Sequence, residues 1–507
     1  MDSAVLNAVL LATPIAAPLL AALVYAPAGW RRATAHAGTA AAALILAGGI
    51  ALAVRVTRHG PEQTWGGWLR ADPLAAFMLL GIGTIATLAC AASPGYLAAA
   101  GHGARDRAAD RRYGVLVGCF LAAMSAAVLA GNLGLSWIAI EATTIVTAFL
   151  VGHAGTRAAL EAAWKYTVIC SVGIALALLG IVVLYDAARH AGLTEAEALN
   201  LPALAAHAHA LDPAVTRMAT VFLVLGFGAK AGLAPLHAWL PDAHGQAPAP
   251  VSALMSGVLL PVAFTQILRI KTVADAALGP AFTRTLLLVL GLATLALAAL
   301  LLVAQRDYKR MLAYSTMENM GLITVGAAIG TPLAITAILL HIAGHGLAKA
   351  VAFTASGHLL AAEHTTRIDQ VKNLAVRNPA LAGIFTAAIL ALLGLPPFSL
   401  FASELGIARA AFAAHLGLPV AAAFALALFA FAALARHTAA MLLGDSQSPP
   451  QPGGTAATVP APAPAPAVPL PLTARIPLIT ALAVVAALGV TAWPINTLLN
   501  LAAHAGH

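Results

Sequence analysis

The chain has 507 residues, of which 61% are hydrophobic and only 9% are charged. Soluble globular domains carry about 25% charged residues, so this composition excludes an ordinary soluble enzyme and indicates an all-α polytopic membrane protein. The formal net charge of +8 does not indicate a nucleic-acid partner. In so apolar a chain, Arg and Lys are expected in the loops that flank membrane spans.

Apolar stretches long enough to cross a bilayer predict about fourteen transmembrane helices. The first has no basic n-region and is followed by Arg31 and Arg32, so we expect a span rather than a cleaved signal. Basic residues concentrate in the loops after odd-numbered spans, which predicts that both termini lie on the outer side. The predicted spans are 4–25, 36–56, 74–98, 113–131, 132–152, 162–185, 216–234, 250–272, 283–304, 311–330, 332–361, 379–413, 418–443 and 474–496.

The three cysteines, Cys90, Cys119 and Cys170, fall in predicted spans and form no Cys-x-x-Cys motif. We therefore expect no disulfide, iron–sulfur cluster or structural zinc in this chain. Any redox chemistry is expected in a partner subunit.

Two proline-containing interruptions divide the predicted helices. In residues 225–250, Lys230 is followed by four prolines, and in residues 392–407 Pro396 and Pro397 precede Glu404. Interrupted helices in corresponding positions of two halves are typical of inverted-repeat transporters; ordinary proline kinks are the alternative. We expect a three-helix segment 1–112, five-helix repeats 113–272 and 283–443 with breaks near 232–241 and 394–403, a Pro/Ala-rich linker 446–473, and a C-terminal helix 474–507.

Ionisable residues inside predicted spans are candidate functional residues, because burying a charge in a bilayer is costly. Glu141 lies near the centre of its span, where Lys230 or Lys165 could pair with it. Such a pair either controls the binding of a proton by the lysine or is a static ion pair that fixes how the helices pack. Lys165 lies in the first turn of its span and has Glu161 four residues earlier on the same helix face. A surface ion pair between Lys165 and Glu161 is therefore an alternative of equal weight to a role in transport.

His237 and His244 flank the first break, with Asp242 between them. Histidine can pass a proton through either ring nitrogen at physiological pH. We favour that role for His237 and expect His244 and Asp242 to be structural, for example by capping backbone groups freed at the break. Lys309 and Arg310 are expected at the cytoplasmic interface, with Glu318 further inside its span.

His341, His345 and Lys349 recur every four residues and therefore share one face of a helix. They span about 12 Å, a distance that titratable groups can bridge through water. A zinc site on the two histidines would need further ligands that no nearby motif provides. The spacing favours a proton relay, with Glu404 as its outer end. A helix N-terminal carboxylate held by the helix dipole is the alternative for Glu404.

Three segments, GAKAGLAPLHAWLPDAHGQAPAPVSALMSG, QRDYKRMLAYSTMENMG and HGLAKAVAFTASG, resemble the antiporter-like membrane subunits of respiratory complex I and of cation/proton antiporter complexes. The segments STMENMG and WKYTVICSVGIALALLG most closely resemble component F of hydrogenase-4. The resemblance covers roughly residues 70–410. It implies fourteen helices, inverted repeats and proton translocation along a polar axis that contains Glu141, Lys230, His341, His345, Lys349 and Glu404.

The resemblance also implies a bacterial cytoplasmic (inner) membrane, no cofactor in this chain, and partner subunits that carry iron–sulfur clusters with a NiFe centre or a quinone site. Many relatives have a Lys or His in the span after the first break, whereas this chain has Ser252, Ser256 and Pro261. Three alternatives remain open: a Na⁺(K⁺)/H⁺ antiporter subunit, a subunit that couples proton flow to a CO₂-hydrating zinc protein, and a scaffold without transport.

Overall fold

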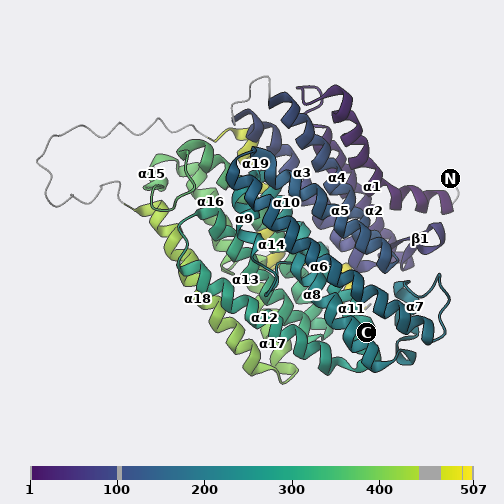
Figure 1. Cartoon of the computed structure of the whole chain (residues 1–507). Coiled ribbons are helices and arrows are strands. Elements are labelled where there is room, and N and C mark those ends of the chain that lie inside the picture. Colours follow the sequence, from purple (N-terminus) through teal and green to yellow (C-terminus); the bar gives the residue numbers. More distant parts are fainter. Residues whose placement is uncertain (1–2, 100–105, 445–469, 494, 505–507) are drawn as a thin grey trace, which may run out of the picture.

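The computed structural model describes residues 3–99, 106–444, 470–493 and 495–504. Its helices lie side by side in one body (Figure 1). Eleven of the described helices are long and apolar enough to cross a membrane. This confirms the predicted all-α polytopic membrane architecture.

The helices follow one another with short connections. The first are α1 (Ser3–Ala28), α2 (Ala37–His59), α3 (Pro73–Ala99), α4 (Asp106–Leu129), α5 (Leu133–Val151), α6 (Arg157–His190), α7 (Leu201–Ala206), α8 (Pro213–Lys230), α9 (Trp239–Gln246) and α10 (Ala249–Leu254). The next are α11 (Leu260–Leu278), α12 (Pro280–Val303), α13 (Tyr308–Ile329), α14 (Pro332–Glu363), α15 (Leu374–Arg377), α16 (Pro379–Leu392), α17 (Ser399–Ala413), α18 (Gly417–Leu443), α19 (Leu472–Val490) and α20 (Asn496–His504). Single turns are η1 (Trp65–Gly67), η2 (Gly152–Ala154) and η3 (Ala208–Ala210), and the π-helical η4 (Met255–Leu259) joins α10 to α11.

The count of fourteen spans stays a prediction. Beyond the eleven long apolar helices, three predicted spans correspond to α8, α13 and the interrupted pair α16 and α17. These helices carry buried polar residues or a break, so they are shorter or less apolar than the rest. The linker predicted at 446–473 lies almost wholly outside the described residues, and the segment after it forms two helices, α19 and α20.

Two local features differ from the sequence expectation. Residues 62–71 form a small antiparallel hairpin of β1 (Glu62–Thr64) and β2 (Leu69–Ala71). The pattern of apolar stretches did not predict it. The polar residues 186–215 predict a short amphipathic helix capped near Thr194, but the Thr194 hydroxyl donates to Glu197 at 2.7 Å and closes a turn instead. This hydrogen bond lowers the pKa of Glu197. The short helix α7 begins later, capped by Asn200, whose side chain accepts from Ala203 N at 3.1 Å.

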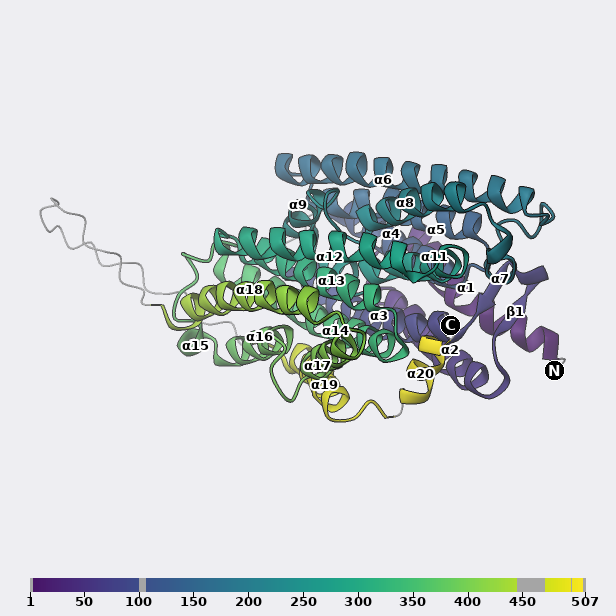
Figure 2. The same ribbon diagram turned by 90° about the horizontal axis from the view of Figure 1, so that it is seen from below.

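Helix α14 is the centre of the second half of the molecule. It contacts α3, α10, α13, α16, α17, α19 and α20. In Figure 2, α6 lies along one long side and α19 along the other, with α14 between them. Gly346 of α14 meets Gly257 of η4 so closely that a Cβ on Gly346 would lie 2.7 Å from the Gly257 carbonyl oxygen. Helix α14 is therefore packed directly against the segment that follows the first break.

Candidate functional site

The first break lies directly after Lys230, where α8 ends, and α9 begins at Trp239. The backbone groups freed by the break have partners from neighbouring elements. Ala234 N donates to Thr294 Oγ1 of α12 at 3.0 Å, and Trp239 Nε1 donates to the Ala229 carbonyl at 2.9 Å. A break inside a bilayer needs such partners, because unsatisfied backbone groups cost several kcal/mol there.

Lys230 is completely buried at the end of α8. Its ammonium donates to Thr144 Oγ1 of α5 at 2.9 Å and to the Tyr166 hydroxyl of α6. Glu141 lies one turn before Thr144, close enough to act on the Lys230 charge. The structure thus brings Glu141 and Lys230 together, but the lysine is hydrogen-bonded to two hydroxyls.

Glu141 itself is partly buried on α5. Among the described residues, its Oε2 is shielded from solvent and has no hydrogen-bond partner. An unpaired buried carboxylate oxygen beside a buried lysine is a group that could receive that lysine or a proton. Neither Thr144 nor Tyr166 was identified from the sequence, because a single hydroxyl residue in an apolar helix carries no distinctive pattern.

Lys165 lies away from this pair. Its side chain is 46% exposed and pairs with Glu161 at 2.7 Å and with Asp242 at 3.2 Å. Asp242 also accepts from Arg310 at 3.2 Å, so one carboxylate joins α6, α9 and α13. This geometry matches the surface pair that the sequence left open for Lys165. A transport role for Lys165 stays a prediction.

The two histidines around the first break have different surroundings. His237 lies in the break itself, half-buried, and its Nδ1 is buried without a hydrogen-bond partner among the described residues. His244 on α9 is completely buried and stacks on Phe353 of α14, with ring centroids 5.3 Å apart. Neither ring nitrogen of His244 has a hydrogen-bond partner in the described part of the chain. The expectation that His244 caps freed backbone groups is therefore wrong.

His244 connects the two halves of the molecule. Lys309 and Lys349 are both close enough to act on its charge, and Trp239 lies between His244 and Tyr166, with ring centroids 6.5 and 4.9 Å away. Lys309 lies in the first turn of α13, is 2% exposed and donates to the Ala247 carbonyl at 2.7 Å. The break between α9 and α10 leaves that carbonyl free, which explains why the lysine turns inward.

His341, His345 and Lys349, which share one face of α14, are all completely buried. His341 is held from two sides: Nδ1 lies 2.9 Å from Ser403 Oγ of α17, and Nε2 lies 2.9 Å from Asn319 Oδ1 of α13. Lys349 donates to the Leu312 carbonyl at 2.8 Å. Between them His345 stacks 6.4 Å from His341, and neither of its ring nitrogens has a partner among the described residues.

Glu404 lies on α17, one residue after Ser403 and beside the second break. Its carboxylate oxygens lie 2.5 and 2.6 Å from the position that a Cβ on Gly394 would occupy. Gly394 has φ +64°, a left-handed conformation that glycine adopts readily. Glu318 of α13 is close enough to Glu404 and Lys349 to act on both charges. The second break thus leaves room for a carboxylate at the end of the α14 polar face.

The site offers acids, bases and hydroxyls. No group of three or more His, Cys, Asp or Glu side chains within the described ranges has a metal-binding arrangement. The polar side chains instead form a series through the middle of the bundle, from Glu141 and Lys230 past His244 to Lys349, His345 and His341, and on to Glu404. Such a series is suited to moving protons between neighbouring titratable groups.

Comparison with known proteins identifies the family. Residues 130–430 match the family model described as NADH:quinone oxidoreductase/Mrp antiporter, transmembrane. NADH-quinone oxidoreductase subunit N of Desulforudis audaxviator (strain MP104C) is 31% identical over 367 residues, which cover 71% of each chain. The hydrogenase-4 component F homolog of Methylacidiphilum infernorum (isolate V4) is 39% identical over 303 residues, 60% of this chain and 64% of that protein. The chain therefore matches slightly less than two thirds of the hydrogenase-4 relative.

Solved structures share the fold across nearly the whole chain. A chain of the membrane-bound sulfane sulfur reductase, an archaeal respiratory membrane complex, superposes with a TM-score of 0.84 at 23% identity, covering 98% of this chain and 97% of that one. A chain of the Mrp complex from Dietzia sp. DQ12-45-1b gives 0.83 at 23% identity, with the same coverage. The chain belongs to the NADH:quinone oxidoreductase/Mrp antiporter transmembrane family.

Proposed function

We propose that this chain is a proton-translocating subunit of a redox-driven membrane complex related to hydrogenase-4 and complex I. The observation that carries the proposal is the buried series of titratable side chains that joins the two interrupted helices. Lys230 and Lys349 have no exposed surface at all. Burying a lysine in a bilayer costs about 2.5–3.5 kcal/mol even on the insertion scale, so two such residues mark a candidate ion pathway.

The proposed mechanism is switching of a charge pair. When the Lys230 ammonium leaves Glu141, it loses the stabilising opposite charge and releases its proton towards the second half. His244 provides the handover, because it follows the first break and lies beside Lys349 and Lys309. It takes the place of the Lys or His that many relatives carry in the next span, where Ser252 and Ser256 are hydrogen-bonded to the His244 carbonyl and to Thr316.

In the second half, the proton passes along His345 and His341 of α14 to Glu404, which releases it on the outer side. His341 can hold a proton on both ring nitrogens without losing a contact. Nε2 then donates to Asn319, Nδ1 donates to Ser403, and the Ser403 hydroxyl donates to the Leu400 carbonyl at 2.8 Å. This arrangement suits a group that gains and loses a proton repeatedly.

Transport against a membrane potential needs an energy source outside this chain. Moving one charge against 100 mV costs about 2.3 kcal/mol. We propose that partner subunits with iron–sulfur clusters, and a NiFe centre or a quinone site, supply it in the cytoplasmic membrane of a bacterium, with both termini of this chain outside. An Na⁺(K⁺)/H⁺ antiporter complex is the alternative, since one of the Na(+)/H(+) antiporter subunits of Alkalihalophilus pseudofirmus is 32% identical over 294 residues.

Affinity purification of the tagged chain in mild detergent, followed by mass spectrometry, tests the proposed complex. Recovery of a hydrogenase-like or quinone-reducing module with iron–sulfur proteins supports the redox-driven pump. The recovered complex is then placed in vesicles, and proton uptake is measured with the redox substrate or with an imposed Na⁺ gradient. Transport driven only by the Na⁺ gradient, or recovery of only membrane antiporter subunits or a soluble zinc protein, overturns the redox assignment.

A further inference from the structure

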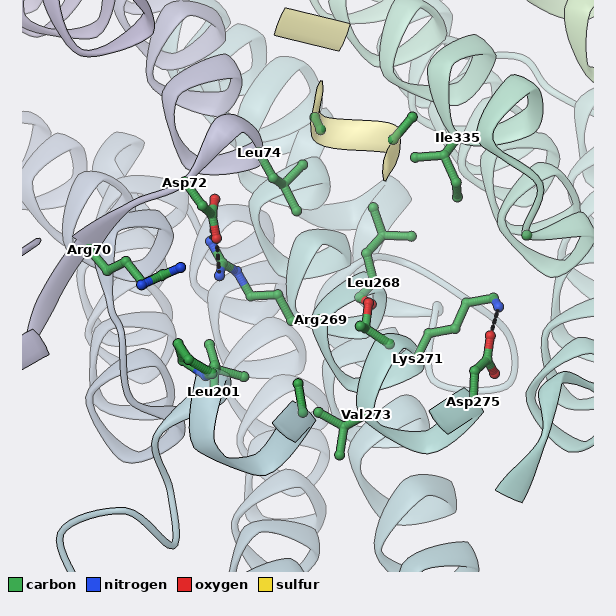
Figure 3. A pocket seen from close by; sticks show the side chains of 16 residues that line it. Arg70, Asp72, Leu74, Leu201, Leu268, Arg269, Lys271, Val273, Asp275 and Ile335 are labelled. Carbon is green, nitrogen blue, oxygen red and sulfur yellow. Dashed lines mark hydrogen bonds and ion pairs between the residues drawn. The ribbon is translucent and has the colours of Figure 1, made fainter. Parts of the chain in front are cut away.

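A cavity lined by charged side chains lies away from the proton series, at the end of the bundle that holds the β-hairpin and α20. It has a volume of about 190 Å³ and is lined mainly by β2, α7, the last turns of α11, and α20, with Leu74 of α3 and Ile335 of α14. Three cationic side chains, Arg70, Arg269 and Lys271, and two acidic ones, Asp72 and Asp275, surround it. Figure 3 shows Arg70 reaching towards Asp72 and Arg269 on one side, with Lys271 and Asp275 on the other.

The two carboxylates in this cavity are already occupied. Asp72 accepts two hydrogen bonds from Arg269, at 2.8 and 3.2 Å, and one from Ala75 N at 2.8 Å. Asp275 accepts from Lys271 and from the Thr283 hydroxyl. These contacts leave little acceptor capacity in the cavity for another cation.

Donors, in contrast, remain in excess. The Arg70 guanidinium makes no hydrogen bond or ion pair within the described structure. The Arg269 side chain is only 9% exposed, yet its Nε has no partner in the described ranges. Lys271, also 9% exposed, uses one of its three donors on Asp275. Burial lowers the pKa of the Arg70 guanidinium, and the nearby Asp72 carboxylate only partly offsets that decrease. Unpaired guanidinium donors in a confined cavity are suited to a phosphate, which Arg binds through two parallel hydrogen bonds.

We propose that this cavity, the Arg70 pocket, binds a phosphate group, either of an anionic phospholipid headgroup or of free phosphate. Its walls include apolar side chains, among them Leu74, Leu268 and Ile335, which surround the charged groups in Figure 3. A basic pocket between membrane helices with an apolar wall matches the chemistry of an anionic lipid, whose phosphate is followed by acyl chains. This site does not depend on the proposed proton transport.

The test measures thermal unfolding of the full-length chain in neutral detergent during titration with phosphatidylglycerol, with phosphatidylcholine, or with inorganic phosphate. A ligand that binds only the folded chain raises the unfolding midpoint. Arg70→Gln removes a side chain that has no partner within the described structure, so the fold is expected to survive. Arg58→Gln makes the same charge change at an exposed position at the end of α2, just before the hairpin, and is the matched control.

We expect phosphatidylglycerol to stabilise the wild type and Arg58→Gln equally, and Arg70→Gln to bind about tenfold more weakly, the equivalent of 1.4 kcal/mol. The affinity of Arg70→Lys for phosphatidylglycerol is expected to lie between those of the wild type and Arg70→Gln. Lysine keeps the positive charge but lacks the planar pair of donors that a guanidinium offers. Stabilisation by inorganic phosphate alone, lost in Arg70→Gln, would also support the pocket and identify free phosphate as its ligand. No stabilisation of the wild type by either anion, or equal stabilisation of Arg70→Gln and Arg58→Gln, would overturn the proposal.

Discussion

The Lys230 ammonium is hydrogen-bonded to Thr144 at 2.9 Å, one helical turn beyond Glu141 on the same helix. The lysine is therefore held next to its expected acidic partner by a hydroxyl rather than by the carboxylate. A short movement along α5 would exchange one contact for the other. In the proposed charge-pair switch, the contact with Thr144 and a contact with Glu141 would be the two states.

Tyr166→Phe removes the second hydroxyl that holds Lys230. A hydrogen bond to a charged group contributes about 1.5–3 kcal/mol. We therefore expect redox-driven proton uptake to fall by about tenfold, with the complex still assembled. Tyr185→Phe on the same helix is the matched control, since the Tyr185 hydroxyl makes no hydrogen bond in the described structure. Equal rates for the two variants would show that Tyr166 does not position Lys230.

Ser403→Ala removes the partner of His341 Nδ1. His341 would then be held only by Asn319, and its protonated form would lose an acceptor for one N–H. We expect proton uptake to fall severalfold, with little change in stability. Ser399→Ala on the same helix is the control, because the buried Ser399 hydroxyl has no hydrogen-bond partner among the described residues. If Ser399→Ala impaired transport as strongly, the effect would come from helix packing and not from His341.

Gly394→Ala places a Cβ where the Glu404 carboxylate now lies. We expect proton uptake to fall as far as in Glu404→Gln, because the carboxylate must move away from the second break. Gly383→Ala in the preceding helix α16 is the control, since a Cβ there meets no atom within 4 Å. Normal transport in Gly394→Ala would mean that the position of Glu404 is not important.

Asp242→Asn tests whether the contacts of Lys165 are structural. Its partners Lys165 and Arg310 are 46% and 44% exposed, and exposed ion pairs contribute about 0–1 kcal/mol. We expect only a small fall in the unfolding midpoint and nearly normal proton uptake for Asp242→Asn and for Lys165→Gln. A loss of uptake in Lys165→Gln comparable to that in Lys230 variants would instead support the transport role predicted for Lys165.

The sequence predicted the parts of the site that stand out against an apolar background. A lysine before a run of prolines, three polar residues at intervals of four, and a glutamate after Pro-Pro are unusual in membrane helices, and each lies at a break or on a buried helix face. The surroundings of His244 could not be predicted, because its neighbours Phe353, Lys309 and Lys349 come from distant segments. Thr144, Tyr166 and Ser403 were missed because hydroxyl residues are common in such helices. The π-helical turn at 255–259 has no local signal.

Lys230→Ala tests the central claim most directly. The measurement is redox-driven proton uptake by vesicles that contain the affinity-purified complex, normalised to the amount of assembled complex. Lys372→Ala, a lysine in the connection before α15, is the control. Removing a group that carries the proton is expected to cost about 10²-fold or more, so Lys230→Ala should show no measurable uptake while Lys372→Ala behaves as wild type. A Lys230→Ala complex that assembles normally and pumps at the wild-type rate would contradict the account.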